Sequence, residues 1–183
     1  LRGLPNTEVI VGDARCTAPR TLRVANRQLT APRIFLNVGG RAVVPDLPGV
    51  REVPTLDNRT VMELAEVPEH LVVIGGSYIG LEFAHLMRRF GADVTVVELS
   101  PQLLPREDED VSAEIRAILE HEGIEIRTGA DCLSLAGKGD GVAVGLACGD
   151  GPPLAEGSHL LLAVGRVPNT DDLGLDVAGI ETD

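Results

Sequence analysis

The chain has 183 residues, of which 44% are hydrophobic and 24% charged, and its formal net charge at pH 7 is −12. This composition indicates a globular protein with a sizeable core. No apolar run in the sequence approaches the roughly 20 residues that a membrane-spanning helix needs. The negative charge argues against nucleic acid or anionic lipid as a partner, because both require clustered Lys and Arg.

The N-terminal part of the chain lacks helical periodicity. The pattern predicts a turn at residues 26 and 27, a crossing segment marked by Pro45 and Pro48, and a short helix over about residues 56–64. Short strands are predicted over residues 8–11, 21–24, 28–30 and 33–38.

The run LVVIGGSYIGLEFA, residues 71–84, is the most informative stretch of the chain. Residues 71–74 are typical of a buried parallel strand, and a glycine-rich turn follows them. Gly75 permits a sharp turn, the small Ser77 allows a pyrophosphate to approach the backbone, and Gly80 allows close packing of helix on strand. The diphosphate would lie against free amides at the helix N-terminus.

The surroundings of this turn favour a dinucleotide site. Gly91 ends the following helix, the apolar strand over residues 94–97 comes next, and Glu98 at its end can accept hydrogen bonds from the hydroxyls of an adenosine ribose. The alternative is a simple tight turn with a solvated acid. Apolar residues recur at helical spacing between the two strands: Ile79, Phe83, Leu86, Met87 and Phe90.

The remaining elements complete an α/β pattern. A helix is expected from the acidic cluster at 107–110 through about Glu122, and the acids there need only be helix capping. A third parallel strand over 124–127 would complete βαβαβ. Residues 132–135 and 142–147 predict a hairpin or meander, and 159–164 another strand. The expected fold is a Rossmann-like parallel sheet with helices and a β-meander.

The cysteines and histidines give no sign of a metal site or of a catalytic group. Cys16, Cys132 and Cys148 are widely spaced and form no CxxC or CxxxxC pair, which indicates reduced thiols in a cytoplasmic protein. The four histidines form no acid–base pair and are interpreted as structural or surface residues. We therefore predict no metal ligand and no catalytic residue within the chain.

Four motifs in this order resemble the flavin-dependent pyridine nucleotide disulfide oxidoreductases, in the branch of dihydrolipoamide dehydrogenase and mercuric reductase. In chain order they are FLNVGG at 35–40, IGGSYIGLEFA at 74–84, the acid Glu98, and LLLAVGRVPNT at 160–170. The resemblance implies that residues 1–47 are part of a split FAD domain with flanking strands, 48–167 the NAD(P)-binding domain, and 168–183 the return to the FAD domain.

The resemblance also implies cofactor-binding residues. Glu98 would bind the adenosine ribose, Cys132 would lie beside the adenine, and Gly165 at the other edge of the cofactor. Val38 and Gly39 would meet the FAD. The pyrophosphate and nicotinamide would be bound by Gly75, Gly76, Ser77, Tyr78, Ile79, Gly80 and Glu82.

Two of these residues have further implied roles. Tyr78 resembles the tyrosine that covers the nicotinamide pocket in relatives and swings aside for the cofactor, although it can also be simple packing in the first helical turn. Glu82 would pair with a lysine outside this chain, or be an exposed acid. NAD is favoured over NADP, because Leu99 and Pro105 stand where NADP-using relatives carry arginines, although Arg106 lies nearby.

The resemblance implies a fragment of an enzyme that passes hydride from reduced nicotinamide to FAD and then to a cysteine pair. The isolated chain is expected to bind NAD(H) without FAD binding or turnover, and the full-length parent to form a homodimer. The alternative is a catalytically silent NAD-binding or redox-sensing module. A second glycine motif followed by CxxxxC in the parent reading frame would favour the enzyme. The electron acceptor is not encoded in this segment.

Overall fold

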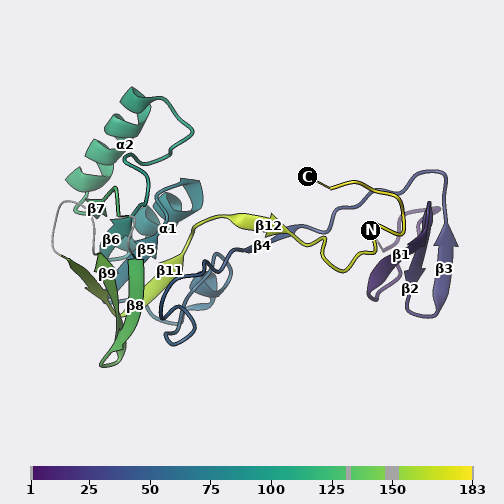
Figure 1. The fold of residues 1–183 in the computed structure, drawn as a ribbon, viewed down its shortest axis with the longest axis horizontal. Helices are drawn as coiled ribbons and strands as arrows, with labels where there is room; N and C mark the ends of the chain where they lie inside the picture. Colours follow the sequence, from purple (N-terminus) through teal and green to yellow (C-terminus); the bar gives the residue numbers. More distant parts are fainter. Residues whose placement is uncertain (1, 131–132, 147–152, 183) are drawn as a thin grey trace. The chain divides into compact units, whose positions relative to one another are not determined.

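The structure, a computed structural model, describes residues 2–130, 133–146 and 153–182. The chain divides into two compact units (Figure 1). The central unit is Ala42–Arg166, and the split unit combines Leu1–Arg41 with Val167–Asp183.

A four-stranded parallel sheet with strand order β11-β5-β6-β7 forms the middle of the central unit. Helix α1 (Tyr78–Arg89) connects β5 to β6, and helix α2 (Glu109–His121) connects β6 to β7. This βαβαβ arrangement with a fourth parallel strand confirms the predicted fold class. The strands are β5 (His70–Ile74), β6 (Asp93–Val97), β7 (Glu125–Arg127) and β11 (His159–Leu162).

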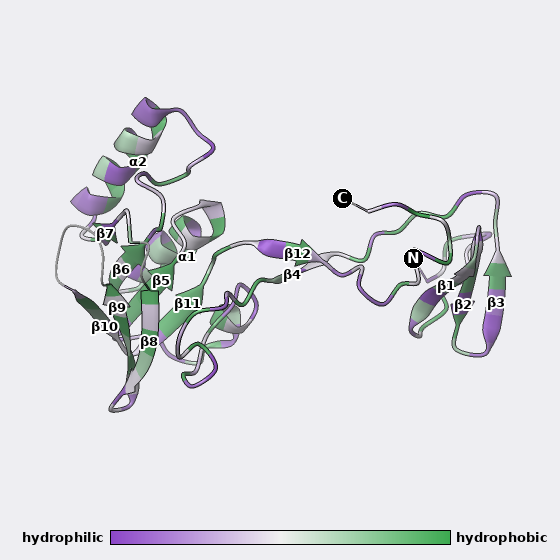
Figure 2. Cartoon of the chain, in the orientation of Figure 1, coloured by the Kyte–Doolittle hydropathy of each residue, from purple (hydrophilic) through white to green (hydrophobic). Residues whose placement is uncertain are grey.

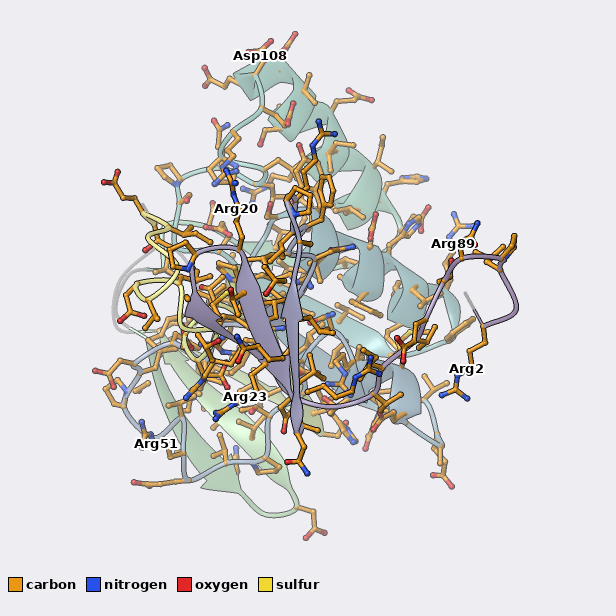
Figure 3. All side chains as sticks on the ribbon, turned by 90° about the vertical axis from the view of Figure 1, so that its right-hand side faces the viewer. Arg2, Arg20, Arg23, Arg51, Arg89 and Asp108 are labelled. Atoms are coloured by element: carbon orange, nitrogen blue, oxygen red, sulfur yellow. The ribbon has the colours of Figure 1, made fainter. Side chains whose placement is uncertain are left out.

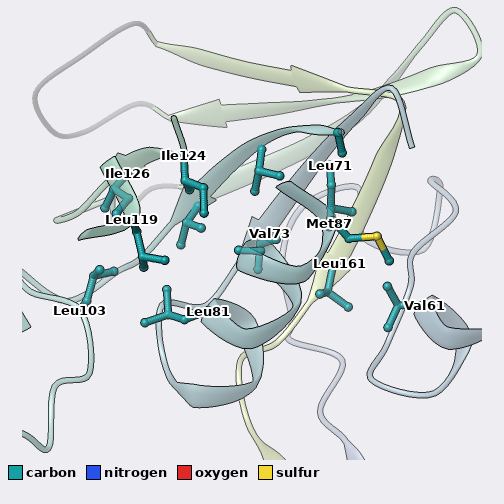
Figure 4. Close-up of a cluster of buried hydrophobic side chains, with 14 of the residues drawn as sticks. Val61, Leu71, Val73, Leu81, Met87, Leu103, Leu119, Ile124, Ile126 and Leu161 are labelled. Carbon is teal, nitrogen blue, oxygen red and sulfur yellow. The ribbon is translucent and has the colours of Figure 1, made fainter. Parts of the chain in front are cut away.

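Both faces of this sheet are buried, so β5 and β11 are continuous hydrophobic runs after an initial histidine (Figure 2). Side chains alternate along a strand. Leu71 and Val73 of β5 therefore pack toward the helices, in the cluster of Figure 4, whereas Val72 and Ile74 pack in a second cluster on the opposite face.

An antiparallel meander covers the second face. Strand β9 (Gly141–Leu146) lies between β8 (Leu133–Lys138) and β10 (Leu154–Gly157). Alternate residues of these strands join the second cluster; Val144 of β9, for example, is fully buried. The hairpin of β8 and β9 matches the prediction for the described residues, whereas β10 had not been predicted.

The two helices begin and end as their sequences predict. Asp108 occupies the N-cap position of α2 and is exposed (Figure 3), and the first turn is acidic, which is favourable at the positive end of the helix dipole. Gly91 after α1 and Gly123 after α2 have φ values of 105° and 84°, the left-handed conformation that commonly ends a helix. Phe90, the last of the apolar residues at helical spacing, is the C-cap of α1 and is 60% exposed.

The split unit contains an antiparallel sheet of β1 (Ala14–Ala18), β2 (Thr21–Val24) and β3 (Arg27–Thr30). The C-terminal segment joins it, because Cys16 N–H donates to the Leu173 carbonyl at 2.7 Å. The turn between β2 and β3 lies at residues 25–26, one position before the predicted turn. Strands β4 (Gly40–Ala42) and β12 (Arg166–Pro168) pair with each other. The two boundaries between the units fall within these strands.

Three predicted elements of this first part of the chain were wrong or too long. Residues 8–11 and 33–38 form no strand, because a strand needs a hydrogen-bonded neighbour and none is present for them among the described residues. Phe35 is accordingly 88% exposed. The helix expected over 56–64 is a single 3₁₀ turn, η1 (Thr60–Glu63), whose Val61 joins the first cluster.

Candidate functional site

The glycine turn connects the carboxyl end of β5 to α1 and is too crowded for side chains at two of its glycines. Gly75 has φ 114°, and a Cβ there would lie 2.5 Å from the Ala163 carbonyl oxygen. A Cβ on Gly80 would lie only 2.0 Å from the Gly75 carbonyl oxygen. Since real Cβ atoms essentially never approach backbone this closely, glycine is required for the helix to start beside the strand.

The first amides of α1 are available to a ligand. The intrahelical bonds begin with Leu81 N–H donating to the Ser77 carbonyl at 3.0 Å, so the amides of residues 78–80 precede them. Ser77 occupies the N-cap position, and its hydroxyl makes no capping hydrogen bond. A helix N-terminus of this kind favours an anion, and the free hydroxyl adds a donor.

A pocket of about 620 Å³ lies against this turn within the central unit. Its walls include the start of α1, the residues that follow β6, the loop before α2 and the residues after β11. Ligands of open parallel sheets bind at this edge, outside the carboxyl ends of the strands. The pocket is lined among others by Ser77, Tyr78, Ile79, Glu98, Leu99 and Gly165.

Glu98 is buried at the rim of this pocket, with 8% of its surface exposed. Its Oε2 accepts a hydrogen bond from Gly76 N–H at 2.5 Å, and its Oε1 accepts one from Ser100 N–H at 2.8 Å. The carboxylate therefore fixes the glycine turn, a role that the sequence did not reveal. A carboxylate offers about four acceptor positions, so two remain for the hydroxyls of a ribose.

Glu98→Gln should lower the free energy of unfolding by about 1–3 kcal/mol, because the amide nitrogen cannot accept a hydrogen bond and leaves one backbone N–H unpaired. Urea unfolding would measure the loss. Glu114→Gln, a change of the same kind on the exposed surface of α2, is the control. Equal stability of the two variants would contradict the structural role of Glu98.

The loop between β6 and α2 lies over the glycine turn. Leu104 is buried with φ 47°, and its N–H donates to the Gly76 carbonyl at 2.9 Å. The side chain of Leu103 packs so closely on Gly76 that a Cβ there would lie 2.6 Å from it. Nothing in the sequence indicated this contact, because it depends on a left-handed leucine that no pattern predicts.

The other predicted site residues occupy different surroundings. Glu82 is exposed, with no hydrogen bond or ion pair to the part of the chain that is described. Gly165 has φ 132° and lines the pocket. Val38 and Gly39 belong to the split unit, where their carbonyls accept from the side chain and backbone of Asn169. Cys132 lies outside the described residues.

Residues that bear on nucleotide choice line the same pocket. Leu99 and Pro105, which were predicted to offer no contact to a 2′-phosphate, are both in its wall, together with Arg106.

Within the described residues, no group of three or more acidic, His or Cys side chains could hold a metal ion. Neither helix of the described chain is long and apolar enough to cross a bilayer.

Comparison with known proteins gives a consistent result. The model of the family "Pyridine nucleotide-disulphide oxidoreductase" matches residues 3–183. The chain is 34% identical to a mercuric reductase of Bacillus cereus over 95% of this chain and 28% of that protein. It is 36% identical to the probable pyridine nucleotide-disulfide oxidoreductase RclA of Escherichia coli, over 98% and 41%.

Solved structures agree in fold. The HOCl-induced flavoprotein disulfide reductase RclA from Escherichia coli matches with a TM-score of 0.86 at 35% identity, over 98% of this chain and 41% of that one. The chain therefore spans less than half the length of these relatives.

Proposed function

The chain belongs to the family of pyridine nucleotide-disulfide oxidoreductases, flavin-dependent enzymes that use pyridine nucleotides, and on that premise we propose that it is the NAD(H)-binding segment of such an enzyme. Reduced nicotinamide, when bound, would supply a hydride for the flavin of the complete protein. The redox-active cysteine pair would lie in the part of the relatives that this chain does not span.

One observation carries this proposal: the glycine turn, whose backbone leaves no space for a Cβ, opens into the pocket with free helix amides and a carboxylate beside it. The turn fits a diphosphate, since its amides point outward from a helix start. Glu98 retains acceptor positions for ribose hydroxyls. Gly165 and Ile79 line the same pocket and would complete the site.

The assignment of units follows from the same proposal. The central unit would bind NAD(H). The split unit would be part of the FAD domain, in which Val38 and Gly39 would contact the FAD. The proposal includes a homodimeric full-length parent.

The isolated chain should bind NADH and, as purified, should lack flavin colour. Titration of NADH fluorescence measures the binding, and the absorbance spectrum reports flavin. Saturable NADH binding by a colourless protein is the expected result. A yellow protein with bound flavin would contradict the assignment of the chain to the nicotinamide side alone.

NADH should bind about tenfold more tightly than NADPH, because the carboxylate of Glu98 would repel a 2′-phosphate and Leu99 offers it no donor. Dissociation constants for the two nucleotides measure the preference. Leu99→Arg should narrow it, since Leu99 lines the pocket and is 46% exposed. The uncharged Leu99→Gln is the control, and tighter binding of NADPH by the unaltered chain would overturn the preference.

A further inference from the structure

Arg106 is the only basic residue of the loop between β6 and α2, residues 98–108. It belongs to the wall of the pocket beside the glycine turn. The other charged residues of that wall, within the described chain, are Glu98 and Arg166. Because Glu98 is buried and negative, Arg106 brings positive charge to a part of the pocket that would otherwise repel an anion.

The backbone on both sides of Arg106 is held in place. Leu104 N–H donates to the Gly76 carbonyl at 2.9 Å, and Glu107 N–H donates to the Leu104 carbonyl at 2.8 Å. The Glu107 carbonyl accepts a further hydrogen bond from Gln102 Nε2 at 3.2 Å. Arg106 therefore starts from a fixed position beside the glycine turn, although its side chain is exposed.

The guanidinium of Arg106 makes no hydrogen bond or ion pair with the part of the chain that the structure describes. The acids next to it in sequence do not hold it, since the Glu107 carboxylate accepts from the Tyr78 hydroxyl and Asp110 Oδ1 accepts from Val111 N–H. The arginines of the two helices, by contrast, all have carboxylate partners: Arg88, Arg89 and Arg116. The donors of Arg106 are thus available to a ligand.

The charge of Arg106 lies near the start of α1. Its hydrogen bond to Glu107 raises the pKa of the Tyr78 phenol, and the charge of Arg106 acts on the same phenol in the opposite direction. Tyr78 is the first residue of α1, and its amide is one of those that precede the intrahelical bonds. The cation and the free helix amides therefore face the same part of the pocket.

A dinucleotide needs such a cation in this chain. The formal net charge is −12, which disfavours the approach of an anion. A helix N-terminus supplies only about half of an elementary charge, whereas a diphosphate is doubly negative. A guanidinium can donate two parallel hydrogen bonds to phosphate oxygens, which combines charge with a defined geometry.

We propose that Arg106 is a binding residue of the dinucleotide pocket, whose guanidinium pairs with the diphosphate from the side opposite the helix amides. The inference rests on the proposed function of the site. NADH and NADPH share the diphosphate, so Arg106 contributes to the affinity for both nucleotides and not to the choice between them.

The test compares NADH and NADPH on the same variants by titration of nucleotide fluorescence. Arg106→Gln should weaken the binding of both by the same factor, about tenfold, at low ionic strength. Arg106→Lys keeps the charge and should restore part of the loss. Arg51→Gln makes the same change at an exposed arginine of the central unit that lies outside the pocket wall (Figure 3), and it should leave both affinities unchanged. Added salt should reduce the loss in Arg106→Gln, because it screens an exposed charge pair.

Each other outcome contradicts a definite part of the proposal. A loss confined to NADPH would assign Arg106 to the 2′-phosphate and overturn its pairing with the diphosphate. Equal NADH affinities of Arg106→Gln and Arg51→Gln would overturn any role in binding, and a loss that is insensitive to salt would show a structural effect instead of a charge pair. Absence of NADH binding by the folded, unaltered chain would overturn the proposed function itself.

Discussion

Gly80→Ala is expected to lower the free energy of unfolding by about 3 kcal/mol and to abolish NADH binding. The added methyl group would lie 2.0 Å from the Gly75 carbonyl oxygen and 3.3 Å from the Ala163 Cβ, so α1 has to move away from the sheet. That movement displaces the helix amides that would hold the diphosphate. Urea unfolding and NADH fluorescence measure the two losses.

Gly137→Ala is the matched control, because a Cβ on Gly137 meets no atom within 4 Å. Its stability should remain within about 0.5 kcal/mol of the unaltered chain, with NADH affinity unchanged. A Gly80→Ala variant that keeps both stability and binding would show that the close approach of helix and strand is not required.

Leu161→Ala should destabilise the central unit by about 2–5 kcal/mol. Leu161 of β11 is fully buried and belongs to the cluster on the helix face of the sheet, together with Val61 and Met87 (Figure 4). Its truncation leaves a cavity beneath α1 that the rigid sheet cannot close. Thermal or urea unfolding of the purified chain measures the effect.

Leu154→Ala makes the same chemical change at a residue of β10 that is 40% exposed. Its loss of stability should be within about 0.5 kcal/mol. If the two leucine variants lost equal stability, the cluster on the helix face would not be the main core of the unit.

The parallel sheet could be predicted from sequence because its strands are buried on both faces. Runs such as HLVVI and DVTVV need no knowledge of their neighbours to be recognised as strands. The glycine turn could also be predicted, since the spacing of its glycines reflects a local steric requirement at Gly75 and Gly80. Features of this kind depend only on residues that are close together in the sequence.

The errors and omissions concern contacts between distant residues. Residues 33–38 have the composition of a strand, but no strand among the described residues pairs with them. The bonds from Gly76 to Glu98 and from Tyr78 to Glu107 join residues 22 and 29 positions apart, and no periodicity encodes them. The sequence thus predicted which residues surround the pocket better than it predicted how they hold one another.

The pairing of β4 with β12 has a consequence for protein engineering. Val43 N–H donates to the Gly165 carbonyl at 3.0 Å, so both ends of the central unit lie side by side. A segment whose ends lie side by side is suited to insertion into another protein, because the host chain needs to be interrupted at only one position. Residues 42–166 therefore offer a portable module for grafting into a surface loop of another protein.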